Sequence, residues 1–260
     1  MARIGILVVA YNAESTLGSV IERIPPAIMA KVEEIFVFDD ASQDRTAAVG
    51  HEYERRLEEG KLVIHRNPVN LMYGGNQQRG YRYAIERGFD FVVLLHGDGQ
   101  YAPEVMQELL TPLETGRAQM VMGSRMLVPG AALRGDMPLY KFVGNKILTW
   151  LENRLIGTNL SEFHSGYRAY SVAALRTIPL GSMTSNWHFD TQIILAFLRR
   201  GYRIAEVPIP TYYGDEICHV NGIPYALNCL REALVFALTE RWRMRGRADS
   251  PLPLASRPEE

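Results

Sequence analysis

Cysteine is scarce in this sequence of 260 residues, where Cys218 and Cys229 are the only two. They form no CxxC pair, so no disulfide framework is expected. The apolar run after Arg3 lasts only from Ile4 to Ala10, which is typical of a first strand and too short for an export signal. No stretch reaches the roughly 18–20 uncharged apolar residues of a membrane span. These absences predict a soluble, cytoplasmic protein with reduced thiols.

An excess of either charge is also lacking, because the formal net charge is −1 at pH 7. Together with the lack of a long basic run, this balance argues against a general nucleic-acid binder. Hydrophobic residues make up 47% and charged residues 22% of the chain, which is sufficient for a sizeable core. Repeats and low-complexity segments are absent, and the length permits one large α/β domain or two small ones.

The glycine-rich GxGxxG turn of dinucleotide-binding enzymes is missing as well. The first apolar run is followed by Ala10-Tyr-Asn-Ala-Glu-Ser15, which contains no glycine. Such a turn cannot cradle a pyrophosphate as the glycine-rich turn does, so an NAD-type Rossmann enzyme is the disfavoured alternative.

Short apolar runs alternate with helix-like segments through the first half of the chain. Strands are predicted at 4–10, 34–38, 61–65, 91–95 and 119–122, and helices at 15–24, 45–59, 73–88 and 103–114. This alternation implies right-handed crossovers and a parallel arrangement of strands. The predicted fold class is therefore α/β, with a mostly parallel central sheet flanked by helices.

Beyond Gly123 the alternation becomes irregular. Segment 128–138 has the composition of a mobile loop, and 165–170 is strand-like. A helix is predicted at 190–199 and an edge strand at 202–209, since Pro208 lacks a ladder donor. Two longer helices are predicted at 223–243 and at 140–156, the latter with an apolar side of Phe142, Ile147, Leu148, Leu151 and Leu155.

The stretch Phe91–Glu104 is the most informative in the sequence. Its five apolar residues predict a strand buried on both faces, and His96-Gly-Asp-Gly-Gln100 follows directly. Ligands of open α/β sheets bind outside the carboxyl ends of the strands. Asp98 and Gln100 offer hard oxygens to Mg²⁺ or Mn²⁺, which would hold a diphosphate. The alternative is a polar turn whose Asp caps the next helix.

Other acidic loops are expected at the same edge of the sheet. Asp39 and Asp40 follow the second predicted strand, Tyr11-Asn12 follows the first, and the segment 162–168 adds Glu162. Carboxylates alone repel a diphosphate, so a metal ion is needed to reverse the local field. Asp39 and Asp40 are alternatively helix caps, a role that suits Asp44 best.

Read together, these motifs resemble those of a known family. The chain is similar to the family 2 inverting glycosyltransferases of GT-A fold, in the branch close to dolichol-phosphate mannosyltransferase. The resemblance covers about residues 4–212, and its motifs occur in family order. They are Val8-Val-Ala-Tyr-Asn-Ala-Glu14, Val37-Phe-Asp-Asp-Ala-Ser-Gln-Asp44, His96-Gly-Asp-Gly-Gln-Tyr-Ala-Pro103, Gly123-Ser-Arg125, Ser165-Gly-Tyr-Arg168 and Glu206-Val-Pro-Ile209.

The resemblance implies a single GT-A domain over residues 1–246. Residues 1–125 would form a Rossmann-like nucleotide-sugar half, and residues 126–246 an acceptor half that ends in an amphipathic helix. Residues 247–260, rich in proline and charge, are predicted to be a disordered tail.

The resemblance also implies a set of ligand-binding residues. Asp98 and Gln100 match the metal-binding positions, and Tyr11 and Asp40 match positions that hold the nucleotide base. The first Asp of the family's DxD motif is His96 here, which puts metal dependence in question, and Ala10 replaces a proline found in many members. The full nucleotide-binding set is Ala10, Tyr11, Asn12, Glu14, Asp39, Asp40, Gly75, Asn76, His96, Gly97 and Asp98.

The implied reaction is an in-line attack of an acceptor oxygen on the anomeric carbon of the sugar. Arg125, and Arg168 as a second candidate, would stabilise the departing nucleoside diphosphate together with the metal. A hydroxyl acceptor requires a base, for which Asp190 and Glu162 are candidates, whereas a phosphate acceptor requires none. Asp190 is alternatively a helix cap, since a helix begins there.

We therefore predict a glycosyltransferase that uses a UDP- or GDP-sugar donor and a lipid-phosphate or other hydroxyl acceptor. The alternative is a non-catalytic nucleotide-sugar-binding module, which the His96 replacement suggests. Trp187, Tyr212 and Tyr213 would stack on a sugar or close the core. The apolar face of the helix 223–243 and the arginines at its end, Arg241, Arg243 and Arg245, suggest peripheral contact with the inner face of a membrane. Packing of this helix on the domain or on a second subunit is the alternative.

Overall fold

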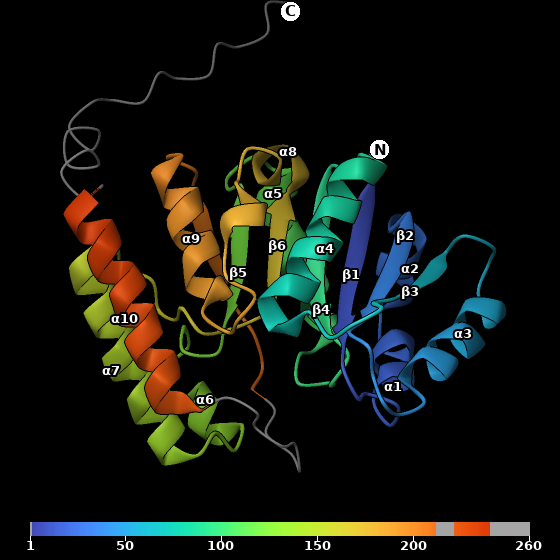
Figure 1. Ribbon diagram of the computed structural model, residues 1–260, viewed down its shortest axis with the longest axis horizontal. Helices are drawn as coiled ribbons and strands as arrows, with labels where there is room; N and C mark the ends of the chain where they lie inside the picture. The colour runs from blue at the N-terminus through green and yellow to red at the C-terminus, as the bar shows by residue number, and fades with distance from the viewer. Residues whose placement is uncertain (1, 212–220, 240–260) are drawn as a thin grey trace, which may run out of the picture.

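The computed structural model describes residues 2–211 and 221–239. Within these residues the chain forms one seven-stranded sheet with the order β3-β2-β1-β4-β6-β5-β7 (Figure 1). The β6 strand is antiparallel to both neighbours, and all other pairs are parallel. This confirms the predicted α/β class and mostly parallel sheet. The strands are β1 (Ile4–Ala10), β2 (Glu34–Asp39), β3 (Leu62–Arg66), β4 (Phe91–His96), β5 (Met120–Ser124), β6 (Arg168–Ser171) and β7 (Ile204–Pro208).

Helices cover both faces of the sheet, which gives three layers (Figure 1). The helices are α1 (Leu17–Glu22), α2 (Pro26–Lys31), α3 (Thr46–Arg56), α4 (Met72–Arg87), α5 (Met106–Glu114, after a 3-10 turn at Pro103–Val105), α6 (Ala131–Arg134), α7 (Leu139–Ile156), α8 (Val172–Leu175), α9 (Phe189–Arg199) and α10 (Gly222–Thr239). One face carries α1, α2, α3 and α5, and the other carries α4, α8 and α9. The α7 and α10 helices pack side by side next to α9.

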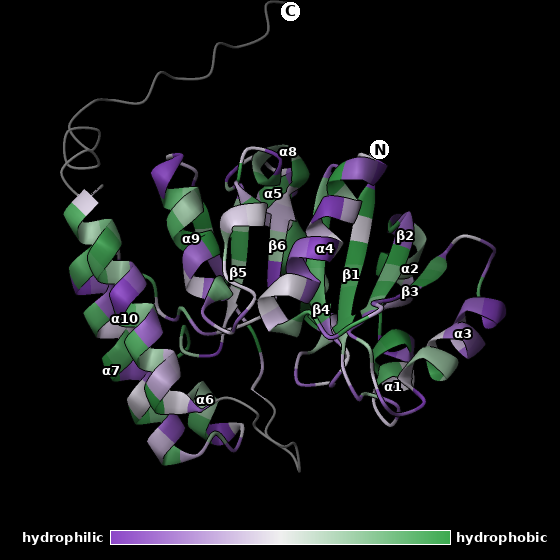
Figure 2. Ribbon diagram, in the orientation of Figure 1, coloured by the Kyte–Doolittle hydropathy of each residue, from purple (hydrophilic) through white to green (hydrophobic). Residues whose placement is uncertain are grey.

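Strand alternation places apolar side chains in both helical layers. On β1, Ile4, Ile6 and Val8 enter the core beneath α1 and α5, whereas Leu7 enters the core beneath α4. Figure 2 shows β1 as a largely hydrophobic strand. A strand buried on both faces reads as a continuous apolar run, which is why β1, β2 and β4 were predictable from sequence.

The sheet topology brings several loops to one edge. Parallel pairing aligns Ala10 with Asp39 and Val9 with His96, so the loops after β1, β2 and β4 emerge together. Because β6 runs in the opposite direction, its first residue, Arg168, lies at this edge opposite Met122 of β5. This edge therefore gathers the polar loops predicted to form the site.

Some predicted elements differ from the structure. The helix predicted at 15–24 ends before Pro25 as expected, at Glu22 of α1. The short helix α2, which begins at Pro26, was not predicted, although proline fits the first turn of a helix. The expected loop 128–138 contains the short helix α6. Ile147 was expected on the apolar side of α7 but is exposed, and the inner face of α7 instead buries Glu152.

The C-terminal predictions are tested only in part. The β7 strand lies at the sheet edge, as predicted from Pro208. Helix 223–243 is described as α10 up to Thr239, while Tyr212, Tyr213, the three terminal arginines and the predicted tail lie outside the described residues. In the described part of the chain, no helix combines the length and apolar content needed to cross a bilayer.

Gly74, near the start of α4, allows α4 to approach the segment before α9 closely. A Cβ there would lie 2.6 Å from the Thr184 carbonyl oxygen and 2.6 Å from the Phe189 Cβ. We expect Gly74→Ala to lower the free energy of unfolding by about 1–3 kcal/mol, since backbone atoms must shift. The matched control is Gly144→Ala in α7, where a Cβ meets nothing within 4 Å. It should stabilise the protein by up to about 1 kcal/mol, as measured by urea unfolding. Equal effects of the two substitutions would contradict this packing.

Candidate active site

The loop after β4 is joined closely to the end of β1. The Gly97 N–H donates to the Val9 carbonyl over 2.9 Å, and Thr16 Oγ1 donates to the Gly97 carbonyl over 2.7 Å. A Cβ at Gly97 would lie 3.1 Å from the Ala10 Cβ and 3.3 Å from the Val9 carbonyl oxygen. A side chain at this position would crowd the end of β1, and its neighbours would have to shift by a few tenths of an ångström, so glycine suits this close approach.

Asp98 and Gln100 stand on the turn that follows. Asp98 is exposed, and its Oδ1 accepts the Gln100 N–H over 3.0 Å. Gly99 has φ +79°, a conformation that reverses the chain without strain only for glycine. An exposed carboxylate beside an amide oxygen is a hard-oxygen donor set. These residues fit Mg²⁺ or Mn²⁺ of the kind that binds a diphosphate.

His96 belongs to an aromatic cluster. Its ring lies 5.7 Å from the ring of Tyr73 and 5.0 Å from that of Tyr101, centroid to centroid. Its Nε2 is buried without a hydrogen-bond partner and faces Gly166. Burial lowers the pKa of His96, so the ring is neutral near pH 7. A metal-ligand role for Nε2 does not fit this geometry, which leaves Asp98 and Gln100 as the predicted ligands.

The two acids after β2 organise their own loops. The Asp39 carboxylate is fully buried and accepts hydrogen bonds from the Ser42 N–H and hydroxyl. Asp40 Oδ1 accepts the Asn67 side-chain amide over 2.7 Å and the Leu71 N–H over 2.8 Å. Burial raises the pKa of Asp40, and these hydrogen bonds oppose the rise. Both acids shape the loops around the predicted base site, and direct contact with a nucleotide stays a prediction.

Asp44 was expected to cap the helix after β2. Its Oδ1 accepts the N–H of Thr46, the first residue of α3, over 2.9 Å. The Asp44 carboxylate also accepts the Glu14 N–H over 3.1 Å, which connects the loops after β1 and β2. Asp44 therefore contacts the start of α3 as expected, from one position before its N-cap residue, Arg45.

Asn76 differs from its prediction. It is buried in α4, where its Oδ1 accepts the Asn67 amide and its Nδ2 donates to the Phe38 carbonyl, both over 2.9 Å. Because both ends of the amide are used inside the protein, Asn76 connects α4 to β2 and does not contact a ligand in this geometry. Its neighbour Gly75 lies against Ser185.

The loop after β1 is held by the loop after β2. Asn12 donates its N–H to Ser42 Oγ and accepts the Gln43 N–H at its Oδ1, both over 2.9 Å. Glu14 accepts the Arg45 N–H over 2.9 Å. Tyr11 remains 46% exposed between these contacts. The arrangement presents one aromatic ring at the edge where the base is predicted to bind.

Arg125 and Glu162 form an ion pair at the end of β5. Glu162 is fully buried and accepts the Arg125 N–H over 2.8 Å, the Arg125 Nε over 3.0 Å and the Asn145 amide over 2.9 Å. The Arg125 side chain is 12% exposed. Burial alone would raise the pKa of Glu162, but Arg125 and its hydrogen bonds outweigh burial and lower it. Glu162 is therefore ionised and fully bonded, which makes it a positioning group for Arg125 and a poor base.

Arg168 is buried, contrary to its predicted contact with the departing diphosphate. Its guanidinium donates to the backbone carbonyls of Phe163, Ser165 and Asp190, each over 2.9 Å, and it is 0% exposed. Burial alone would lower the pKa of Arg168, but the Asp190 carboxylate and nearby tyrosines outweigh burial and raise it. Arg168 thus fastens the segment 163–165 to α9 and has no surface for a ligand.

Asp190 completes this buried network. Its Oδ2 accepts the Tyr73 hydroxyl over 2.8 Å, and its Oδ1 lies 3.4 Å from Arg168 Nη1. Trp187 stacks on Tyr73 at 4.5 Å between ring centroids. Asp190 lies in the first turn of α9, yet its carboxylate is bound by side chains from other elements.

Tyr73 and Tyr101 were not predicted as site residues. Tyr101 directly follows Gln100, and its hydroxyl accepts the Gly166 N–H over 2.7 Å.

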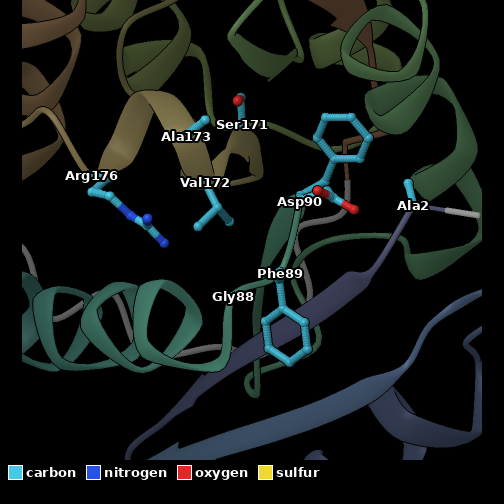
Figure 3. A pocket seen from close by; sticks show the side chains of 9 residues that line it. Ala2, Gly88, Phe89, Asp90, Ser171, Val172, Ala173 and Arg176 are labelled. Carbon is cyan, nitrogen blue, oxygen red and sulfur yellow. The ribbon is translucent and has the colours of Figure 1, made fainter.

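A pocket of about 440 Å³ lies at the opposite edge of the sheet. It is lined by residues 88–91, at the start of β4, and by 171–173 with Arg176, beyond the end of β6 (Figure 3). It contains none of the predicted site residues. The candidate active site is therefore the loop edge described above.

The buried ion pair predicts a measurable cost of neutralising Glu162. We expect Glu162→Gln to lower the free energy of unfolding by about 3 kcal/mol at pH 7, since Arg125 loses its charged partner. The folded pKa of Glu162 lies below its unfolded value, so the stabilisation is present above about pH 4.5 and is lost as pH falls further. The difference in the free energy of unfolding between the wild type and Glu162→Gln should therefore become smaller below about pH 4.

The matched control is Glu104→Gln, which neutralises the partner of Arg23 in an exposed pair. It should cost about 1 kcal/mol or less. Denaturant unfolding between acid and neutral pH measures both variants. A cost for Glu162→Gln no larger than that of the control would contradict the assigned pairing.

Comparison with known proteins agrees with the geometry. Residues 5–178 match the model of the family described as glycosyl transferase family 2. The chain is 29% identical over 247 residues to polyprenol monophosphomannose synthase of Mycolicibacterium smegmatis, covering 94% of this chain and 88% of that protein. It is 32% identical over 214 residues to undecaprenyl-phosphate mannosyltransferase of Micrococcus luteus, covering 80% and 82%.

A solved structure has the same fold. Glucosyl-3-phosphoglycerate synthase from Mycobacterium tuberculosis, in complex with Mn²⁺, uridine diphosphate and phosphoglyceric acid, superposes with a TM-score of 0.66 at 20% identity. The match covers 91% of this chain and 78% of that one. This likeness confirms the predicted GT-A fold. Because the family model spans most of the chain and the sequence relatives match over most of their own length, the protein belongs to glycosyl transferase family 2.

Proposed function

We propose that this glycosyltransferase moves a sugar from a nucleoside-diphosphate donor to the phosphate of a polyprenyl phosphate, with inversion. The observation that supports this acceptor is the state of the two candidate bases. Glu162 is held by Arg125 and Asn145, and Asp190 by Tyr73 and Arg168. Neither carboxylate is placed to take a proton from a hydroxyl. A phosphate acceptor is already ionised at neutral pH and needs no base.

In the proposed reaction, the residues of the chain stabilise the departing diphosphate and bind the nucleotide base. A phosphate oxygen of the acceptor forms a bond to the anomeric carbon as the bond to the nucleoside diphosphate breaks, and the electron pair leaves with the diphosphate. Arg125, oriented by Glu162, lies at the end of β5 and would stabilise the phosphates. A divalent ion held by Asp98 and Gln100 would supply neutralisation of the departing charge. Tyr11 would stack on the base.

The names of the relatives support both the nucleoside-diphosphate donor and the polyprenyl phosphate acceptor. One relative is named for the synthesis of polyprenol monophosphomannose and another for mannosyl transfer involving undecaprenyl phosphate. The structural neighbour holds Mn²⁺ with uridine diphosphate. The hard-oxygen pair Asp98 and Gln100 suits either Mn²⁺ or Mg²⁺.

Transfer to paired acceptors tests the proposal. The full chain is incubated with a panel of UDP- and GDP-sugars, Mn²⁺ or Mg²⁺, and either a polyprenyl phosphate or the polyprenol of the same length. We expect product from the phosphate alone, because nothing in the proposed site deprotonates an alcohol. Product from the polyprenol at a similar rate would overturn the acceptor, and tight nucleotide binding without transfer would favour a non-catalytic module.

Removal of the charge on Asp98 tests the metal-binding pair. We expect Asp98→Asn to lower kcat/KM by about 100-fold or more, since the ion that neutralises the diphosphate is lost. Glu108→Gln, an exposed acid on α5, is the matched control and should retain activity. Activity of Asp98→Asn that remains close to wild type, with unchanged metal dependence, would remove Asp98 from the metal site.

The lipid acceptor also suggests a surface for peripheral membrane contact. Along α7, Leu139, Val143, Ile147 and Trp150 are exposed, and they recur at helical spacing. Along α10, exposed apolar side chains recur in the same way at Ile223, Leu227, Leu234 and Leu238. The proposed occupant of these two stripes is the surface of the bilayer that carries the acceptor.

Liposome flotation tests this surface. Wild-type protein should float with anionic vesicles, and Trp150→Glu with Leu227→Glu should reduce the floated fraction several-fold, since charge is unfavourable in the acyl region. Ala48→Glu on α3, which adds a charge far from these stripes, is the matched control. Absence of flotation together with a dimer in gel filtration would assign the stripes to a second copy of the chain.

A further inference from the structure

Three potential metal ligands converge away from the candidate active site. Glu152 comes from α7, Cys229 from α10, and His164 from the segment before β6. One ligand atom from each residue lies within 4.8 Å of the others. Glu152 and Cys229 are fully buried, and the His164 side chain is 9% exposed. The cluster lies inside the acceptor half, where α7 and α10 pack side by side (Figure 1).

Hydroxyl groups hold the outer atoms of two of these residues. The Tyr225 hydroxyl lies 2.9 Å from His164 Nδ1, and Thr191 Oγ1 donates to Glu152 Oε1 over 3.3 Å. The atoms left over are His164 Nε2 and Glu152 Oε2. Metal-binding histidines and carboxylates are usually oriented in this way, by a partner on the atom that does not face the ion.

The inner atoms are not satisfied by one another. His164 Nε2 and Glu152 Oε2 lie 3.0 Å apart, yet both are buried and neither makes a hydrogen bond. A buried carboxylate oxygen that accepts no hydrogen bond, as Glu152 Oε2 does here, is costly, so a simple ion pair explains this arrangement poorly. Nor does an ion pair require the thiol of Cys229 beside it.

We propose that Glu152 Oε2, His164 Nε2 and Cys229 Sγ bind a divalent transition-metal ion of the Zn²⁺ class. A sulfur, an imidazole nitrogen and a carboxylate oxygen form a donor set typical of zinc, whereas the oxygens of Asp98 and Gln100 suit Mg²⁺ or Mn²⁺. Two ligands at about 2.05 Å from a tetrahedral ion lie about 3.3 Å apart, so the observed pair needs to open by only about 0.3 Å. Binding releases the Cys229 thiol proton to solvent, and the thiolate sulfur bonds to the ion.

Such an ion would join three elements that carry the acceptor half. It would connect α7 and α10 to the segment that contains Glu162 and His164. The His164 carbonyl accepts Arg125 Nη2 over 3.2 Å, so the ion would also steady a backbone partner of Arg125. The role inferred here is therefore structural, and it is independent of the ion at Asp98.

Metal content and cobalt spectroscopy test the site in the untagged full chain. Wild-type protein grown with zinc should retain one equivalent after gel filtration. Metal-free protein titrated with Co²⁺ should develop a thiolate-to-cobalt charge-transfer band and tetrahedral ligand-field bands. Zinc should also raise Tm, because it binds the folded state.

The variants separate this site from the rest of the chain. Cys229→Ser should abolish the charge-transfer band, and Glu152→Gln should weaken Zn²⁺ binding by 10-fold or more. Cys218→Ser, which removes the chain's other cysteine, and Asp98→Asn should both retain the band and the zinc. Circular dichroism and gel filtration establish whether each variant is folded. Substoichiometric zinc in the wild type with no thiolate band, or a band lost in Cys218→Ser and kept in Cys229→Ser, would overturn the proposal.

Discussion

The buried guanidinium of Arg168 is the interaction on which the geometry of the loops around β6 depends. It stands at the first residue of β6 and donates to carbonyls of Phe163, Ser165 and Asp190. Those bonds fix the segment that carries Glu162, which in turn orients Arg125. Through Asp190 the same network reaches Tyr73 and the aromatic cluster around His96. A cation without solvent contact is tolerated because a carboxylate and several carbonyl dipoles surround it.

Most of the acidic residues at the loop edge stabilise the protein's own loops, whereas the sequence suggested that they bind ligands. Asp39, Asp40, Glu162 and Asp190 each accept hydrogen bonds from backbone or side-chain donors, whereas Asp98 is exposed. Negative charge that is already paired does not repel a diphosphate strongly. Such pairing also removes the bases that a hydroxyl acceptor would need. Both effects are consistent with a donor and an acceptor that carry phosphates.

The pattern of apolar residues made much of the fold predictable. The strands β1, β2 and β4 are buried on both faces, so each appears in the sequence as a nearly continuous run of apolar residues. The position of Asp98 and Gln100 followed from the rule that ligands bind beyond the strand ends. The burial of Arg168 and Asn76 was not predictable, since their partners lie far away in sequence. The inner face of α7 was misassigned for a similar reason: Glu152 turns inward to meet His164, a contact that helical periodicity alone does not encode.

The position of β6 in the sheet has a consequence for folding of the chain during its synthesis on the ribosome. The β5 strand reaches the rest of the sheet only through β6, since β4 and β5 flank it and do not pair with each other. A nascent chain that has reached only Ser124 therefore has a β5 with no neighbour and a β4 with one open, apolar edge. The five strands within residues 1–124 therefore do not form one continuous sheet by themselves, and β5 joins the others only through β6, which is synthesised more than forty residues later.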